Sequence, residues 1–228
     1  MSGTLYIVPT PIGNLEDITL RAIRVLKESD LVLCEDTSVT QKLFQEYEIE
    51  TDTTVFYANS AIKNINKILK TLEDGAVVSL VSDAGTPTIS DPGVLLVQKI
   101  YELLPECKVI ALPGASALTT ALSVSGISSA QFTFYGFLPH KKGRETIFKK
   151  IASSEMTSVF YESVHRIEKT LDSLEEILED ERLVVVTREL TKIYEEVVRG
   201  SAKQVKGYFF KHKDKMRGEF VVIVEGKK

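Results

Sequence analysis

Short apolar runs alternate with segments of helical periodicity between residues 4 and 112. The helical segments carry apolar residues three and four positions apart, as at Ile18, Ala22 and Leu26 after the first run. The run at 76–81 is almost continuously apolar, as expected of a strand buried on both faces. The apolar runs lie at 4–8, 30–34, 54–57, 76–81 and 108–112. This alternation predicts a mostly parallel sheet with helices on both of its faces.

Capping signals suggest where these helices begin and end. Ser38 and Gln41 have the spacing of a capping box, which predicts a helix start after the second run. Gly75 is typical of a helix stop after the third helical segment. Asp91 is expected to cap the next helix, with Pro92 in its first turn.

Residues 131–224 follow a different pattern, in which strand-like runs lie close together. Helices are expected around 144–152 and along 167–178, where apolar residues recur at helical spacing. Closely spaced strands favour a mixed sheet with antiparallel pairs. The strand candidates are 131–137, 157–161, 183–187, 193–198 and 219–224. We therefore expect two α/β domains without a long linker. Composition alone places the break after Leu112 or within 138–143.

Several protein classes are disfavoured by composition. No apolar run approaches the roughly 18 residues of a membrane span, and no basic segment followed by an apolar one marks a secretion signal. The two cysteines, Cys34 and Cys107, are not paired at metal-binding spacing. We expect reduced thiols in a cytoplasm and, with three scattered histidines, no zinc site.

The charge is divided unevenly along the chain. A net charge of −4 disfavours a large, non-specific nucleic-acid footprint. Residues 1–112 carry 9 Lys and Arg against 16 Asp and Glu, whereas residues 113–228 carry 19 against 16. Basic clusters lie at 140–144 and 211–217. These clusters are either solvated loops or contacts for phosphates.

Three of the expected strands end in unusual loops, at 8–17, 82–93 and 112–121. Ligands of open α/β sheets bind in the loops at the carboxyl ends of the strands. The first loop has two prolines and one glycine, so it is neither a GxGxxG fingerprint nor a phosphate-binding P-loop. The prolines remove two backbone donors and stiffen the turn. It is either a rigid strand–helix turn or a wall held against a ligand.

The other two loops consist mainly of small residues, which let a ligand approach the backbone. Backbone amides near Gly85 and Thr86 are candidates for hydrogen bonds to a polar cofactor, and Asp83 is harder to explain as a helix cap than Asp91. In the third loop a Pro-Gly turn precedes Ser116, which is suited to capping a helix. Together the three loops predict one pocket, lined by backbone, for a flat heteroaromatic molecule with a polar tail.

A further cluster lies at the end of the strand expected at 157–161. Tyr161, Glu162, His165 and Arg166 follow one another there. Cations that open a helix oppose its dipole, which hints at a site. Placement on the surface explains the cluster equally well.

Taken in order, these segments resemble the tetrapyrrole-methylase superfamily over nearly the whole chain. Within it they are most similar to the branch of 16S rRNA (cytidine) ribose 2′-O-methyltransferases. The matching segments are VPTPIGNLEDITLRA, CEDT, VSDAGTPTISDPG, LPGASALTTAL, FYGFLPHKKG, FYESVHR, TRELTK and RGEFVVIVEG. TPIGNLEDI, SDAGTP with ISDPG, and GFLP with a lysine two positions after it are specific to that branch.

The resemblance implies a class III S-adenosylmethionine methyltransferase fold of two α/β domains. The N-terminal domain, 1–113, would be the substrate side with a mostly parallel sheet, and the C-terminal domain, 114–228, would have a mixed sheet. The resemblance also implies a cofactor in the cleft between the domains, a cytoplasmic homodimer, no metal, and 16S rRNA or the small subunit as partner.

Functional residues carried over by matching motifs divide into two groups. For S-adenosylmethionine they are Pro9, Asp83, Thr86, Pro87, Ile89, Gly114, Ala115, Tyr161, Thr187, Glu219 and Phe220. For the substrate they are Asn14 and Arg21 in the first loop, to which the basic cluster adds Lys141 and Lys142 as contacts for single-stranded or looped RNA.

Transfer of a methyl group to a ribose hydroxyl would be helped by a general base. Glu35, Asp36, Glu162 and His165 are candidates, and no spacing singles one out, so the catalytic residue stays unassigned.

The chain departs from this branch at two places. Ser38 stands where the branch usually has an arginine, and residues 56–61 differ from its usual segment. These departures and the acidic first half favour an alternative, a small-molecule methyltransferase acting on a tetrapyrrole-like substrate. A non-catalytic module that binds cofactor or RNA is a third hypothesis.

Overall fold

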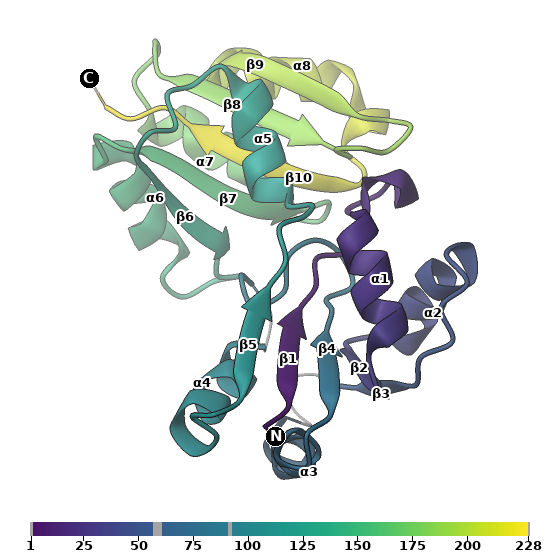
Figure 1. Cartoon of the computed structure of the whole chain (residues 1–228). Coiled ribbons are helices and arrows are strands. Elements are labelled where there is room, and N and C mark those ends of the chain that lie inside the picture. Colours follow the sequence, from purple (N-terminus) through teal and green to yellow (C-terminus); the bar gives the residue numbers. More distant parts are fainter. Residues whose placement is uncertain (1, 57–60, 91–92, 228) are drawn as a thin grey trace. The chain divides into compact units, whose positions relative to one another are not determined.

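The computed structural model describes residues 2–56, 61–90 and 93–227. The chain divides into two compact units, Met1–Ser116 and Ala117–Lys228, called here the first and second units (Figure 1). This division falls after Ser116, three residues beyond the break between Pro113 and Gly114 that the family resemblance implies. Within the described ranges, no helix is long and apolar enough to cross a membrane.

In its described part, the first unit holds a five-stranded sheet in which all strand pairs are parallel. The strands are β1 (Thr4–Ile7), β2 (Leu31–Cys34), β3 (Thr53–Val55), β4 (Val77–Leu80) and β5 (Lys108–Ala111). Their order across the sheet is β3-β2-β4-β1-β5. The parallel sheet expected from residues 4–112 is confirmed.

Helices cover both faces of this sheet because alternate strand residues point to opposite sides. Leu5 and Ile7 belong to a buried cluster with residues of two helices, and Val8 belongs to a separate cluster with residues of two others. The helices of the first cluster are α3 (Ala61–Glu73) and α4 (Gly93–Leu103). Those of the second are α1 (Leu20–Glu28) and α2 (Thr37–Glu46). The prediction of helices on both faces is confirmed.

The cap of α2 differs from the predicted one. The Asp36 carboxylate accepts hydrogen bonds from the Ser38 amide and the Ser38 hydroxyl, both at 2.7 Å. The capping box expected at Ser38 and Gln41 is therefore wrong. The helix begins at Thr37, so Ser38 is already helical and Asp36 supplies the cap. The cap predicted at Asp91, with Pro92, lies outside the described residues.

Before α1, a short 3₁₀ turn, η1 (Leu15–Asp17), occupies much of the first loop. Asn14 caps this turn by accepting a hydrogen bond from the Glu16 amide at 3.1 Å. Thr19 then caps α1 by accepting one from the Ala22 amide at 3.0 Å. Two caps in succession fix the backbone of the first loop from Asn14 to Leu20.

The described part of the second unit holds a mixed five-stranded sheet, which confirms the mixed sheet expected from residues 131–224. Strand β6 runs parallel to β7, and the remaining pairs are antiparallel. The strands are β6 (Phe132–Phe137), β7 (Thr157–Ser163), β8 (Leu183–Arg188), β9 (Glu196–Ser201) and β10 (Glu219–Val224), in the order β6-β7-β10-β8-β9.

The strand expected at 193–198 begins later than predicted, at Glu196. Residues 189–195 form turns instead, with the Lys192 amide bonded to the Glu189 carbonyl at 3.0 Å. Glu189 and Thr191 have positive φ angles of 50° and 66°, which a strand does not accommodate. The β-branched Ile193 therefore lies in a turn despite its strand propensity.

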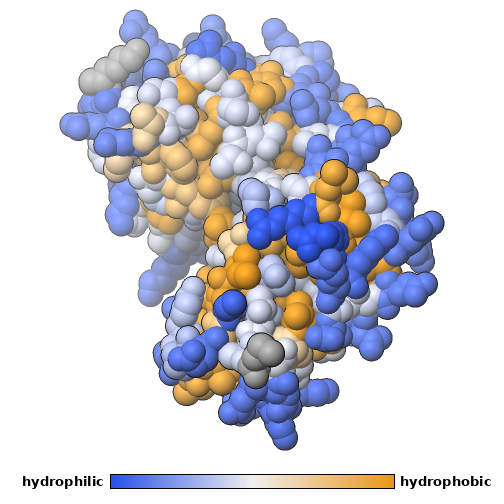
Figure 2. All heavy atoms as spheres, in the orientation of Figure 1, coloured by the Kyte–Doolittle hydropathy of each residue, from blue (hydrophilic) through white to orange (hydrophobic). Residues whose placement is uncertain are grey.

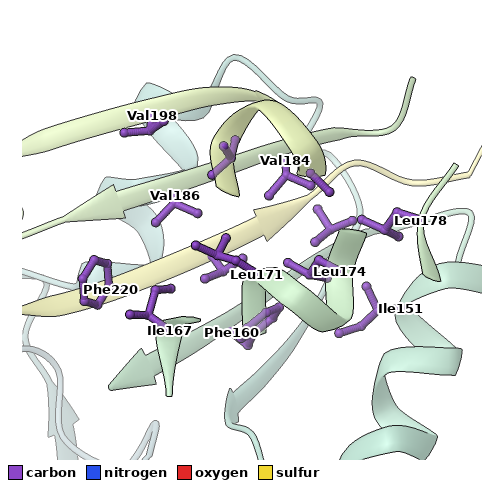
Figure 3. Close-up of a cluster of buried hydrophobic side chains, with 14 of the residues drawn as sticks. Ile151, Phe160, Ile167, Leu171, Leu174, Leu178, Val184, Val186, Val198 and Phe220 are labelled. Atoms are coloured by element: carbon purple, nitrogen blue, oxygen red, sulfur yellow. The ribbon is translucent and has the colours of Figure 1, made fainter. Parts of the chain in front are cut away.

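Three helices pack on one face of this sheet, and α5 (Ala117–Ser125) lies against β8, β9 and β10 on the other (Figure 1). The three are α6 (Arg144–Ser153), α7 (Ile167–Ile177) and α8 (Ala202–Lys211), the last followed by the 3₁₀ turn η2 (Lys213–Lys215). Figure 3 shows the buried cluster between them and the sheet, to which Phe160, Phe220, Leu171 and Leu174 belong. Figure 2 shows that hydrophilic and apolar residues both lie on the surface of each unit.

Candidate functional site

The first unit has a topological switch point between β1 and β4. These strands are neighbours, yet the chain leaves β1 toward α1 on one face and β4 toward α4 on the other. Loops that diverge in this way open a crevice beyond the carboxyl ends of the strands, and ligands of open α/β sheets bind there. The first two of the three unusual loops leave the sheet at this point.

These two loops are hydrogen-bonded to each other. Thr10 and Gly85 exchange both of their backbone hydrogen bonds, each at 3.0 Å. The Thr10 hydroxyl donates to the Ser82 carbonyl at 2.9 Å, and the Ser82 hydroxyl donates to the Gly85 carbonyl at 3.0 Å. Thr10 and Ser82 are buried. The polar groups beneath the loops therefore satisfy one another and hold the two backbones in a fixed relation.

The third loop joins them through Gly114 and Ala115. The Thr86 hydroxyl donates to the Ala115 carbonyl at 3.0 Å. A Cβ atom on Gly114 would lie 2.6 Å from Cβ of Pro9, so a larger residue there would push the first and third loops apart. The three loops therefore contact one another, whereas the pocket predicted at them stays a prediction.

One detail of the prediction is wrong. The Gly85 amide is not available to a ligand, because it already donates to the Thr10 carbonyl. Gly85 instead supplies a left-handed turn, with a φ angle of 88° that favours glycine. Among the predicted cofactor residues of these loops, Asp83, Ile89 and Gly114 are exposed, whereas Pro9 and Pro87 are buried.

Asp83 carries the main electrostatic feature of these loops. It accepts a hydrogen bond from the Asp36 amide at 3.1 Å. Partial burial, and to a lesser degree the charge of Asp36, raise the pKa of its carboxyl above the ordinary value. The pKa of the Asp36 carboxyl is shifted the other way, because the hydrogen bonds from Ser38 lower it. A cap with a lowered pKa makes a weak base, so Asp36 is disfavoured as the general base.

In the second unit, neighbouring strands bring three predicted cofactor residues to one face of the sheet. Tyr161 and Thr187 both pair in register with Val221, one from each side. Glu219 lies two residues before Val221 and therefore shares its face. The Phe220 side chain points to the opposite face, into the core with α7 and α8. Its side chain therefore does not share a surface with Tyr161.

A family model described as tetrapyrrole (corrin/porphyrin) methylases matches residues 4–206 of this chain. The chain belongs to the tetrapyrrole methylase family. It is 46% identical over 225 residues to "Ribosomal RNA small subunit methyltransferase I" of Bacillus subtilis (strain 168), covering 98% of this chain and 75% of that protein.

Solved structures share the tetrapyrrole methylase fold at low sequence identity. The cobalamin biosynthetic enzyme cobalt precorrin-4 methyltransferase matches with a TM-score of 0.70 at 16% identity, over 97% of this chain and 94% of its own. A uroporphyrin-III C-methyltransferase from Thermus thermophilus, complexed with S-adenosyl homocysteine, matches with a TM-score of 0.66 at 18% identity, over 98% and 97%. The two α/β sheets are therefore those of a tetrapyrrole methylase.

The remaining predicted cofactor residues of the second unit differ in how free their side chains are. The Tyr161 ring packs between Phe134 and Phe137, with centroid distances of 5.0 and 5.4 Å, and burial raises the pKa of its hydroxyl. The buried Thr187 hydroxyl donates to the Val221 carbonyl at 3.4 Å. The Glu219 carboxylate is mostly exposed and pairs with Lys192 at 2.9 Å.

The predicted substrate residues lie on exposed turns. Asn14 uses its side-chain oxygen to cap η1, and Arg21 is exposed in the first turn of α1. Lys141 and Lys142 are exposed on the turn before α6. The second basic cluster is partly neutralised, because Lys215 pairs with Glu196 at 2.6 Å.

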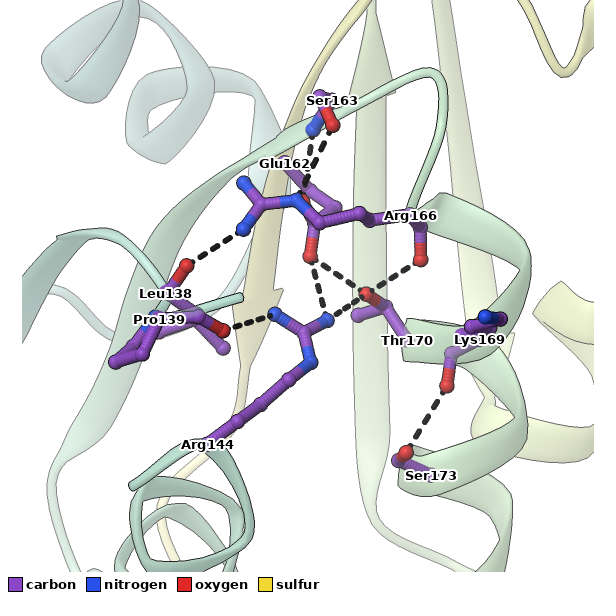
Figure 4. A network of polar contacts seen from close by, with 9 residues as sticks. All are labelled: Leu138, Pro139, Arg144, Glu162, Ser163, Arg166, Lys169, Thr170 and Ser173. Carbon is purple, nitrogen blue, oxygen red and sulfur yellow. Dashed lines mark hydrogen bonds and ion pairs between the residues drawn. The ribbon is translucent and has the colours of Figure 1, made fainter. Parts of the chain in front are cut away.

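Glu162 is fully buried, and both of its oxygens are engaged (Figure 4): Oε2 accepts hydrogen bonds from Arg144 and Thr170, and Oε1 accepts one from the Ser163 amide and forms an ion pair with Arg166. A carboxylate has about four lone-pair sites in all. Because these sites are taken, Glu162 is disfavoured as a general base. His165 is exposed and Glu35 half-buried, and these two stay candidates.

Proposed function

We propose that this chain is an S-adenosylmethionine-dependent methyltransferase that methylates the ribose 2′-hydroxyl of a cytidine in 16S rRNA of the small subunit. The proposal is supported by the Bacillus subtilis relative, whose name states that it is a ribosomal RNA small subunit methyltransferase. The observation that carries it is the set of three mutually bonded loops at the switch point of the first unit. The motifs specific to the rRNA branch lie on two of these loops.

The same loops fit S-adenosylmethionine. At Gly114 and Ala115 the backbone carries little or no side chain, so a ligand can approach it closely. Asp83 offers an exposed carboxylate as acceptor for hydroxyl or amino groups of the cofactor. The related uroporphyrin-III C-methyltransferase was solved with S-adenosyl homocysteine, which supports this choice of cofactor. The individual contacts remain predictions, including those of Tyr161, Thr187 and Glu219.

When bound, the cofactor supplies an electrophilic methyl group on a sulfonium. The protein's contribution is mainly alignment: holding a ribose hydroxyl in line with that methyl contributes up to about 7–11 kcal/mol to lowering the barrier. As the oxygen–carbon bond forms, the hydroxyl proton must leave to a base or to water. Of the four candidate bases, Glu35 and His165 stay predictions.

RNA would be held by phosphate contacts and base stacking. Arg21, Lys141 and Lys142 are exposed cations suited to phosphates. Their number is small, in keeping with a net charge of −4. A homodimer and a cytoplasmic location, both implied by the family, also stay predictions.

The test is a methylation assay on small subunits from cells that lack this gene. Purified protein and methyl-labelled S-adenosylmethionine should yield labelled 2′-O-methylcytidine after digestion of the rRNA to nucleosides. Label in a base rather than a ribose, or no label at all in rRNA, would contradict the proposal. In a parallel assay with a tetrapyrrole as the methyl acceptor, transfer of label to the tetrapyrrole but not to rRNA would support the small-molecule alternative.

A further inference from the structure

A buried ion cluster joins three elements of the second unit (Figure 4). Glu162, near the end of β7, pairs with Arg144 of α6 at 2.7 Å and with Arg166, just before α7, at 2.8 Å. The hydroxyl of Thr170 on α7 and the Ser163 amide also donate to this carboxylate, at 2.6 and 2.8 Å. The two arginine side chains are 15% and 13% exposed, so the cluster is largely shielded from water.

Both arginines use a second donor to hold the segment between β6 and α6. Arg166 donates to the Leu138 carbonyl at 2.6 Å, and Arg144 donates to the Pro139 carbonyl at 3.3 Å. On its far side the segment closes in a turn, where the Arg144 amide donates to the Lys141 carbonyl at 3.2 Å. The loop 138–143 is therefore fastened at both ends, and Glu162 is the one carboxylate that orients both guanidinium groups of the cluster.

The solvent-exposed surface of this loop is positively charged. His140, Lys141 and Lys142 are exposed, and the loop contains no acidic residue. Within the described ranges neither lysine forms an ion pair, in contrast to Lys149 farther along α6, which pairs with Glu145. The cluster beneath also carries one more positive than negative charge, since two guanidinium groups share one carboxylate. Such a field attracts phosphates.

We propose that Glu162 is a positioning residue for RNA binding, which holds Lys141 and Lys142 in one arrangement toward RNA phosphates through Arg144 and Arg166. This inference rests on the proposed function and deepens it, because it concerns how the same protein binds its RNA. A loop fixed in advance loses less conformational freedom when RNA binds, so its contacts contribute more to affinity.

A double-mutant cycle on RNA binding tests the proposal. The probe is a fluorescent single-stranded RNA of small-subunit sequence, titrated at several salt concentrations. Replacing both lysines, Lys141→Gln with Lys142→Gln, should raise the RNA Kd by roughly tenfold and lower the salt slope by about 1.4, or 0.7 for each lost contact. Glu162→Gln should produce much of the same loss with both lysines present. Adding Glu162→Gln to the lysine variant should cause little further change.

The proposal would be overturned if the effects of Glu162→Gln and of the lysine variant on the free energy of RNA binding were fully additive. It would also be overturned if Glu162→Gln left the RNA Kd and the salt slope unchanged. The Kd for S-adenosyl homocysteine should stay the same in every variant. A change in this Kd would indicate a general loss of structure. If Glu162→Gln does not fold, Arg144→Lys replaces it: the lysine keeps a charge beside Glu162 but cannot bridge to both Glu162 and Pro139. It should show the same non-additivity with the lysine variant.

Glu175→Gln is the matched control. Glu175 on α7 of the same unit pairs with Lys206 at 2.6 Å and has no contact with the loop among the described ion pairs. Its removal should leave the RNA Kd and the salt slope unchanged. Because the cycle is read from binding alone, it supports or overturns the role of Glu162 whether or not methyl transfer is detected.

Discussion

At the scale of single residues, Asp83 combines an exposed position with a perturbed carboxyl. Its pKa lies above the ordinary value because of partial burial and the nearby Asp36 charge. Perturbed groups at the carboxyl ends of strands are candidates for function, since a protein gains no stability from raising the pKa of a carboxyl group. Asp83 therefore allows stability and cofactor binding to be separated.

We expect the affinity for S-adenosyl homocysteine to depend on pH through Asp83. The carboxylate is the stronger acceptor, so affinity should be full above its raised pKa and fall as the pH drops through it. Asp83→Asn should weaken binding by about 1.5–3 kcal/mol and remove this pH dependence. Its free energy of unfolding should be unchanged or higher, because an amide oxygen still accepts from Asp36 without the charge repulsion. Calorimetric titration of the ligand at several pH values checks the affinity and its pH dependence. Equal affinities of Asp83→Asn and the unchanged protein would refute a cofactor role for Asp83.

Gly85 allows a second prediction at this scale. With a φ angle of 88°, an alanine there would be strained by about 1–3 kcal/mol. Its Cβ would also lie 3.3 Å from Ile12 of the first loop. Gly85→Ala should lower the free energy of unfolding by that amount in urea titrations and weaken cofactor binding. Gly207→Ala is the control, since a Cβ there has no heavy atom within 4 Å. Inside a helix such as α8, alanine is more stable than glycine by about 0.5–1 kcal/mol.

The sequence revealed the loops but not the side chains that connect them. Pro9, Asp83 and Gly114 stand out as unusual residues after strands, so contact among these loops was predictable. Thr10 and Ser82 are ordinary residues whose role depends on a partner 72 positions away. No local pattern encodes such a bond. The cluster around Glu162 was visible as charged residues, but only the fold shows that it is buried.

At the scale of elements, α8 is a helix that the sequence reading missed. Ser201 and Gln204 form a complete capping box in which each side chain accepts from the backbone of the other. Val205 and Phe209 then recur at helical spacing and are buried. The signal was therefore present in the sequence, although no helix was predicted there.

Removing this cap should destabilise the second unit. Ser201→Ala leaves the Gln204 amide without its partner, so the free energy of unfolding should fall by about 1 kcal/mol. Ser173→Ala on α7 is the matched control: that hydroxyl bonds back to the Lys169 carbonyl inside the helix, and alanine is the better helix former. Its effect should lie within about 0.5 kcal/mol of zero. Thermal unfolding monitored by circular dichroism separates the two, and equal losses would contradict the assigned cap.

At the scale of the whole molecule, periodicity predicted most of the architecture. The parallel sheet followed from the alternation of apolar runs and helices, and the mixed sheet from closely spaced strands. The order of strands did not follow, because it depends on which pairs form at long range. The order matters for function, since placing β4 beside β1 creates the switch point at which the loops meet.

The central claim is that these three bonded loops hold the methyl donor. Hydrogen–deuterium exchange of the full chain, with and without S-adenosyl homocysteine, tests it most directly. We expect slower exchange on binding in residues 8–17, 82–90 and 112–116, and loss of that protection in Asp83→Asn at equal ligand concentration. Binding of S-adenosyl homocysteine that leaves exchange in all three segments unchanged would contradict the account.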